Sequence, residues 1–180
     1  MTERTFAHWV EPVATRLRES RACVLEYARA VQEDAWATPS PLEGWSCKDV
    51  LAHLGKANDQ MFQAILREVI AGRHLDRSIF AVDTDGDNER LVEERRGRPV
   101  SEIIAELEEA GDEVQALLSQ LTEAAEDYRQ EDPPFILSGF MRLVLREDHD
   151  GEHLAQLRQA LTRPAPTKSE RKRKIRIGRT

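Results

Sequence analysis

The spacing of apolar residues along the chain predicts four amphipathic helices. The first series runs from Val10 to Ala35 at steps of three, four and seven residues, which is the spacing of one helix face. Three further segments show an apolar stripe of the same period, and they cover residues 46–71, 101–121 and 135–161. No alternation typical of β-strands competes with these segments. The pattern therefore predicts an all-α fold, a four-helix bundle.

Helix-breaking and capping residues predict where these helices begin and end. Two prolines and a glycine between residues 39 and 44 prevent the first helix from continuing. Ser46 stands three residues before Asp49, the spacing of a capping box, and predicts the start of the second helix. Residues 72–99 form a long polar connection between the second and third helices, a length typical of functional or mobile loops. Ser101 is expected to cap the third helix.

Length and composition fit one globular domain. The chain has 180 residues, of which 40% are hydrophobic and 33% charged, values within the globular range. It shows no apolar run of about 18 residues and no secretory signal, so a soluble, cytoplasmic protein that does not enter a membrane is expected. Two cysteines are too few for a disulfide framework.

The charge is distributed unevenly, and this divides the chain. The formal net charge is −7, yet residues 163–180 hold eight Lys or Arg residues and a single acid. We therefore expect residues 1–162 to form the bundle and residues 163–180 to form a basic, disordered tail. An acidic body is a poor surface for a phosphate backbone, and the tail has no interleaved aromatic residues, so nucleic acid is not an expected partner.

Three histidines are the candidates for metal binding. His149 and His153 are four residues apart, so on a helix they project from the same face and can bind one ion together. On a helical wheel, His53 lies beside the apolar arc of the second helix. Helices that face each other in a bundle commonly build metal sites from such positions. The alternatives are a chance histidine pair and, for His53, a core histidine with an ordinary hydrogen-bond partner.

Three segments resemble the DinB-like superfamily and its branch related to mycothiol-dependent maleylpyruvate isomerase. Residues 42–54 contain a Gly-Trp-Ser turn that opens a helix bearing a histidine, and residues 149–156 contain two histidines four apart followed by a glutamine. Residues 87–96, Asp-Asn-Glu-Arg-Leu-Val-Glu-Glu-Arg-Arg, are similar to the connection seen in that branch. The resemblance covers about residues 10–162 and does not include the C-terminal substrate domain of the full isomerases.

The resemblance implies a four-helix bundle in which His53, His149 and His153 bind a divalent metal ion, zinc or nickel. Three protein ligands leave a coordination position for water or substrate, the form that catalytic sites use. The resemblance also implies a transferase or isomerase that acts with a low-molecular-weight thiol, such as mycothiol or bacillithiol, on a small electrophile, and it suggests homodimers. The alternative is a non-catalytic metal-binding bundle of the stress-response or ligand-binding kind.

Several neighbouring residues have weaker functional interpretations. Gln156 lies one turn beyond His153 and is a candidate contact for the cofactor or an imidazole; a solvated glutamine is nearly as plausible. Asp148 and Glu152 could orient imidazoles, but they are more simply interpreted as solvent-facing charges. Gly151 is expected inside the helix, at a cost of about 1 kcal/mol relative to alanine. Cys47 is expected to be packed and inert. Acidic residues between 83 and 94 have calcium-loop spacing but lack its glycine, so calcium binding is not expected.

Overall fold

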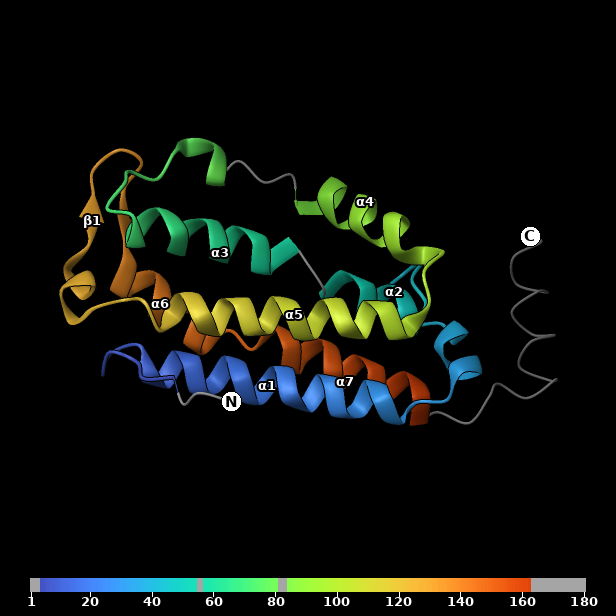
Figure 1. Ribbon diagram of the computed structural model, residues 1–180. Helices are drawn as coiled ribbons and strands as arrows, with labels where there is room; N and C mark the ends of the chain where they lie inside the picture. The colour runs from blue at the N-terminus through green and yellow to red at the C-terminus, as the bar shows by residue number, and fades with distance from the viewer. Residues whose placement is uncertain (1–3, 55–56, 81–83, 163–180) are drawn as a thin grey trace.

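The predicted all-α class is confirmed by the computed structural model, which describes residues 4–54, 57–80 and 84–162 (Figure 1). The predicted basic tail lies outside the described residues. The α-helices are α1 (Glu11–Ala30), α2 (Cys47–Leu54), α3 (Ala57–Ile70), α4 (Thr84–Arg96), α5 (Val100–Leu118), α6 (Leu137–Arg146) and α7 (His149–Thr162). Short 3-10 turns are η1 (Glu33–Ala37), η2 (Arg77–Phe80) and η3 (Glu123–Asp127), and a small antiparallel hairpin pairs β1 (Arg129–Gln130) with β2 (Phe135–Ile136). No helix within these described ranges is long and apolar enough to cross a membrane.

The helices run along one long axis of the molecule. Helix α5 packs between α1 and α3, α7 packs against α1 and α2, and α4 lies over α2 (Figure 1). The hairpin and α6 lie at one end, and α2 and η1 lie at the other. The predicted capping box at the start of α2 is confirmed, because Asp49 accepts the Ser46 backbone amide at 2.8 Å and its own amide donates to the Ser46 hydroxyl at 3.2 Å.

Several predicted boundaries are wrong. The first helix ends at Ala30 instead of continuing to residue 35, where the chain forms η1. The predicted fourth helix is interrupted: residues 135–136 form β2, and Glu147 has an extended backbone between α6 and α7. Ser101 does not cap the third helix, because α5 begins at Val100 and its N-cap residue is Pro99, which makes no side-chain capping bond.

The expected long connection between residues 72 and 99 contains a helix, α4. Its apolar periodicity is weak because only Leu91 and Val92 are buried apolar side chains there, so the sequence pattern did not reveal it. Ion pairs hold α4 in place instead. Arg95, 2% exposed, pairs with Glu106 of α5, and Arg96 pairs with Asp49 of α2. The helical conformation of residues 84–96 also fits the expectation that this segment is not a calcium loop.

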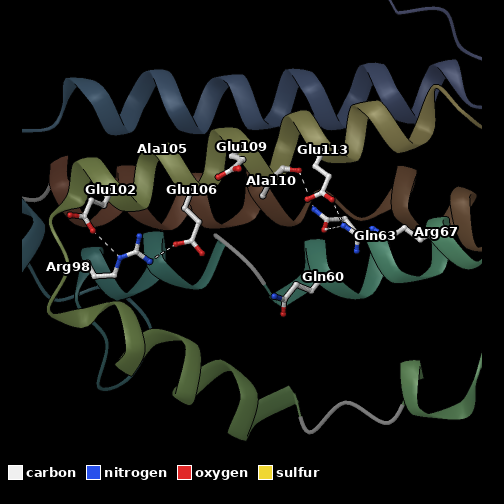
Figure 2. A pocket seen from close by; sticks show the side chains of 10 residues that line it. All are labelled: Gln60, Gln63, Arg67, Arg98, Glu102, Ala105, Glu106, Glu109, Ala110 and Glu113. Atoms are coloured by element: carbon white, nitrogen blue, oxygen red, sulfur yellow. Dashed lines mark hydrogen bonds and ion pairs between the residues drawn. The ribbon is translucent and has the colours of Figure 1, made fainter.

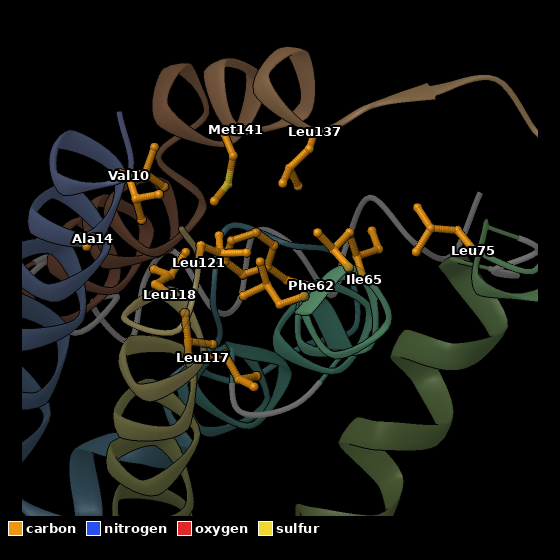
Figure 3. Packing of buried hydrophobic residues seen from close by; sticks show 14 of the residues in the cluster. Val10, Ala14, Phe62, Ile65, Leu75, Leu117, Leu118, Leu121, Leu137 and Met141 are labelled. Carbon is orange, nitrogen blue, oxygen red and sulfur yellow. The ribbon is translucent and has the colours of Figure 1, made fainter. Parts of the chain in front are cut away.

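The apolar core forms two clusters along the long axis. The first joins one end of α1 to α3, α6 and the C-terminal half of α5 (Figure 3). The second joins the other end of α1 to α2, α7 and the N-terminal half of α5. Polar side chains lie where the two clusters meet: Arg21 stands between Ala14 and Val24 on α1, and Gln63 of α3 donates to the Ala110 carbonyl of α5. This polar layer is where a site could be built.

We expect Glu106→Gln to destabilise the protein by about 3 kcal/mol, because the substitution leaves the buried Arg95 guanidinium without its counter-charge. Urea unfolding measured by circular dichroism tests this. Glu109→Gln on the same helix is the control, because Glu109 is exposed and has no ion pair among the described residues. Equal urea midpoints for Glu106→Gln and Glu109→Gln would show that the Arg95–Glu106 ion pair does not stabilise the fold.

Candidate metal centre

The three predicted histidines come together at the contact between α2 and α7. His53 is the last residue but one of α2, and His149 and His153 lie one turn apart at the start of α7. The Nε2 atom of His149 is 3.2 Å from Nε2 of His53 and 3.1 Å from Nε2 of His153. One ligand atom of each of the three residues lies within 4.8 Å of the others. His53 is buried, and the other two imidazoles are partly buried.

The helix start at Asp148 fixes the position of His149. The Asp148 carboxylate accepts the backbone amide of Gly151 at 3.1 Å, and its carbonyl accepts the amide of Glu152 at 2.8 Å. Gly151 is therefore in the first turn, not in the helix interior as expected. A Cβ atom at Gly151 would lie 2.1 Å from the Asp148 carboxylate, so glycine leaves room for this cap.

Two arginines of α1 bind the aspartates on either side of His149. Arg16 donates to Asp148 at 2.6 Å, and Arg21 donates to Asp150 at 2.6 Å and to the Leu107 carbonyl of α5 at 2.9 Å. The expectation that Asp148 is only a solvent-facing charge is therefore wrong. The Arg21 and Asp150 side chains are 12% and 13% exposed, so this pair is well shielded from water. Together the two pairs fix the first turn of α7 against α1.

Gln156 fixes the orientation of His153. Its Oε1 atom lies 2.8 Å from Nδ1 of that imidazole. A carboxamide oxygen can only accept, so Nδ1 carries the proton and Nε2 of the neutral ring is left with a free lone pair. Hydrogen-bond partners of this kind orient histidine ligands in known metal sites. The structure thus brings Gln156 to the site, where it contacts an imidazole.

The local environment keeps His53 and His149 neutral. Burial lowers the pKa of His53 to about 4, assisted by His153 and His149. Burial also lowers the pKa of His149 to about 4, with His153 and Arg21 acting in the same direction and Asp150 and Asp148 opposing them. At neutral pH both rings therefore offer a lone pair, which is the form that binds metal ions.

The spacing of the nitrogens fits a divalent metal ion. Zinc–nitrogen bonds of 2.0–2.1 Å in a tetrahedron place two ligand nitrogens about 3.3 Å apart, close to the Nε2 separations of 3.2 Å between His53 and His149 and 3.1 Å between His149 and His153. Without a cation, at most one of these two contacts can be a good hydrogen bond, because His153 Nε2 has no proton to give. The arrangement is therefore chemically suited to hold a cation.

Asn88 of α4 was not among the predicted site residues. Hydrogen bonding by its side chain acts to raise the pKa of His53, against the larger lowering effect of burial. The Nδ1 atom of His53 is buried and has no hydrogen-bond partner among the described residues. The signal in the sequence was a polar residue three and four positions before the buried Leu91 and Val92, on the same helix face.

The other candidate residues do not join the cluster. Glu152 is exposed. Cys47 is buried, which confirms the expectation of a packed cysteine, and burial raises the pKa of its thiol. The Trp45 ring lies 5.3 Å from that of His53, centroid to centroid, so this tryptophan packs against the cluster.

A separate charged groove lies between α3 and α5 (Figure 2). It has a volume of about 680 Å³, and none of the three histidines lines it. Arg98 pairs there with Glu102 and Glu106, and Arg67 pairs with Glu113, so most of its carboxylates are neutralised within the protein. The chemistry described above therefore belongs to the histidine cluster.

The chain is similar to one known family of proteins. The family model of the mycothiol maleylpyruvate isomerase N-terminal domain matches residues 17–149. Solved structures of the mycothiol-dependent maleylpyruvate isomerase and of a histidine-to-alanine variant of it match with TM-scores of 0.65 and 0.64, at 13% and 12% identity. Each match covers 82% of this chain and 60% of the other, so the chain spans about 60% of the length of these enzymes and shares their fold. No curated protein matches the chain.

We expect the metal-free protein to lose stability as the pH falls from about 6.5 to about 4. In the unfolded chain His53 and His149 take up protons below their usual pKa of 6.5, whereas in the folded chain they do so only near pH 4. The contribution of the two neutral histidines to the free energy of unfolding is therefore fully present above pH 6.5 and is lost as the pH falls toward 4. The loss is at most about 1.4 kcal/mol per pH unit for each histidine. Urea midpoints measured with chelator between pH 7.5 and 5 check this. A variant with both histidines changed to glutamine should show a flatter profile, and an equally steep one would contradict the assignment.

Proposed function

Because the chain belongs to the mycothiol maleylpyruvate isomerase N-terminal domain family, whose model matches residues 17–149, we propose that it is a metal-dependent transferase or isomerase that acts with a low-molecular-weight thiol. The observation that carries the proposal is the convergence of three imidazole Nε2 atoms at the α2–α7 contact. In this proposal His53, His149 and His153 are the ligands of one divalent ion, with zinc or nickel preferred. We further propose a cytoplasmic location, where small thiols are kept reduced.

The number of ligands supports a catalytic site over a structural one. Among the described residues, the cluster of histidine, cysteine and acidic side chains holds three members, whereas structural zinc sites are normally closed by four. A divalent ion bound there would favour the thiolate form of a coordinated thiol, which is the nucleophile, at neutral pH. His149 is partly exposed, whereas His53 is buried.

The protein's own residues have distinct parts in this proposal. Burial keeps His53 and His149 unprotonated, so protons do not compete with the ion near neutral pH. Gln156 holds the proton of His153 on Nδ1. Arg21 and Asp150 fix the first turn of α7, and the negative charge of Asp150 beside His149 favours a cation at the cluster. We therefore propose Gln156 as a residue that positions a ligand of the cofactor.

We expect one zinc or nickel ion per chain in protein purified without an affinity tag, and less than a tenth of this in His53→Ala and His149→Ala. Gln156→Ala should keep the site but bind the ion about 10- to 100-fold more weakly, because His153 loses the partner that fixes its tautomer. Elemental analysis measures the metal content, and competition with a chelating dye measures the affinity.

The controls are His74→Ala, which changes an exposed histidine, and Gln159→Ala, which changes an exposed glutamine of α7. A stoichiometric ion that persists in both histidine variants would reject the ligand assignment.

We expect the metal-loaded protein to accelerate the reaction of mycothiol or bacillithiol with a soft electrophile such as 1-chloro-2,4-dinitrobenzene. The acceleration should disappear with chelator and in His149→Ala, and His74→Ala should retain it, because the ion raises the thiolate fraction of the bound thiol above that of the free thiol. Loss of the free thiol over time is the measurement. A metal-loaded protein that binds neither thiol and alters no rate would instead favour the non-catalytic metal-binding bundle.

A further inference from the structure

His53 differs from His153 in how its ring is held. Nδ1 of His153 lies 2.8 Å from Oε1 of Gln156, and a histidine that binds a metal ion through one ring nitrogen usually makes such a hydrogen bond through the other. Nδ1 of His53 is buried and has no hydrogen-bond partner among the described residues. A contact other than a hydrogen bond at Nδ1 must therefore orient this imidazole.

The indole of Trp45 packs against the His53 ring from outside the histidine cluster. The two ring centroids are 5.3 Å apart and the ring planes are inclined by 56°, which is the geometry of an aromatic pair in contact. The other rings that contact His53 in the described part of the chain belong to His149 and His153, at 5.1 and 4.9 Å, and both are proposed ligands. Trp45 thus restricts rotation of the His53 ring about its Cβ–Cγ bond without competing for the ion.

A closed turn fixes the backbone of Trp45. Its carbonyl accepts the amide of Ser40 at 2.8 Å, and its amide donates to the carbonyl of Leu42 at 3.2 Å. The next residue, Ser46, belongs to the capping box of α2. The turn that carries the indole therefore continues directly into the helix that carries His53.

We propose that Trp45 is a positioning residue for the metal centre, because its indole holds the His53 imidazole with Nε2 turned toward the ion. The inference rests on the proposed function, which supplies the ligand set. Nε2 of His53 lies 3.2 Å from Nε2 of His149. Without the indole the ring can rotate and present Nδ1 instead, since no hydrogen bond from a described residue holds that atom. Partners that orient ligand histidines correspond to about 10- to 100-fold in metal affinity.

A tryptophan that only fills the apolar core would affect stability and leave the metal centre unchanged. Trp36 provides the matched comparison, because it is 2% exposed and belongs to the apolar cluster against which Trp45 packs. Within the described ranges its ring contacts no histidine. Trp36→Leu should lower the urea midpoint, because it leaves a cavity, yet keep the zinc affinity within about threefold of wild type.

Competition with a chelating dye measures the zinc affinity, and nitrogen-15 NMR of the imidazoles identifies the nitrogen of His53 that binds zinc. We expect Trp45→Leu and Trp45→Met, which keep an apolar side chain but no ring, to bind zinc about tenfold or more weakly. In both variants His53 should be metal-free or bound through Nδ1. Trp45→Phe should keep Nε2 binding and an affinity within about threefold of wild type, because the phenyl ring preserves the contact. Circular dichroism verifies that each variant is folded.

Zinc affinity of Trp45→Leu within about twofold of wild type, with His53 still bound through Nε2, would overturn the inference and leave the metal centre standing. An equal loss of zinc affinity in Trp36→Leu would also overturn it, because a general loss of stability would then explain both variants. Failure of the wild-type protein to bind zinc through the three histidines would reject the proposed ligand set and, with it, this inference.

Discussion

The Nε2 atoms of three imidazoles lie close together between α2 and α7, and the rest of the site serves to hold them there. The Nε2 atoms are separated by 3.2 and 3.1 Å, while burial holds His53 and His149 in the neutral form. Because His153 donates its Nδ1 proton to Gln156, at most one of the two contacts can be a good hydrogen bond without a metal ion. A cation bound to all three nitrogens would satisfy them together. The polar contacts around the cluster keep the three rings in place for it.

The architecture supports this arrangement by separating the core into two apolar clusters with a polar layer between them. The interruption after Arg146 allows a new helix to begin at Asp148, so that His149 lies in a capped first turn. Arg21 crosses from α1 to Asp150 close to Gly111 of α5, where a Cβ atom would lie 3.2 Å from the arginine side chain. Ion pairs rather than apolar burial thus determine where the ligand-bearing turn sits.

Sequence periodicity predicted the helical class and the three histidines because both depend on local spacing. The four-residue interval of His149 and His153, and the place of His53 beside an apolar arc, are visible without a structure. Helix α4 was missed because Arg95 anchors it through charge, and apolar periodicity does not register such contacts. Asn88 was missed for a related reason: its effect on the pKa of His53 depends on a residue 35 positions earlier in the chain, which the pattern of a single helix cannot reveal.

The most direct test of the account is a crystal structure of the zinc-loaded protein with anomalous diffraction at the zinc edge. The account predicts a single strong peak about 2.0–2.1 Å from the Nε2 atoms of His53, His149 and His153, with a non-protein ligand completing the coordination. A zinc peak held by carboxylates elsewhere, with the three imidazoles free of metal, would contradict it.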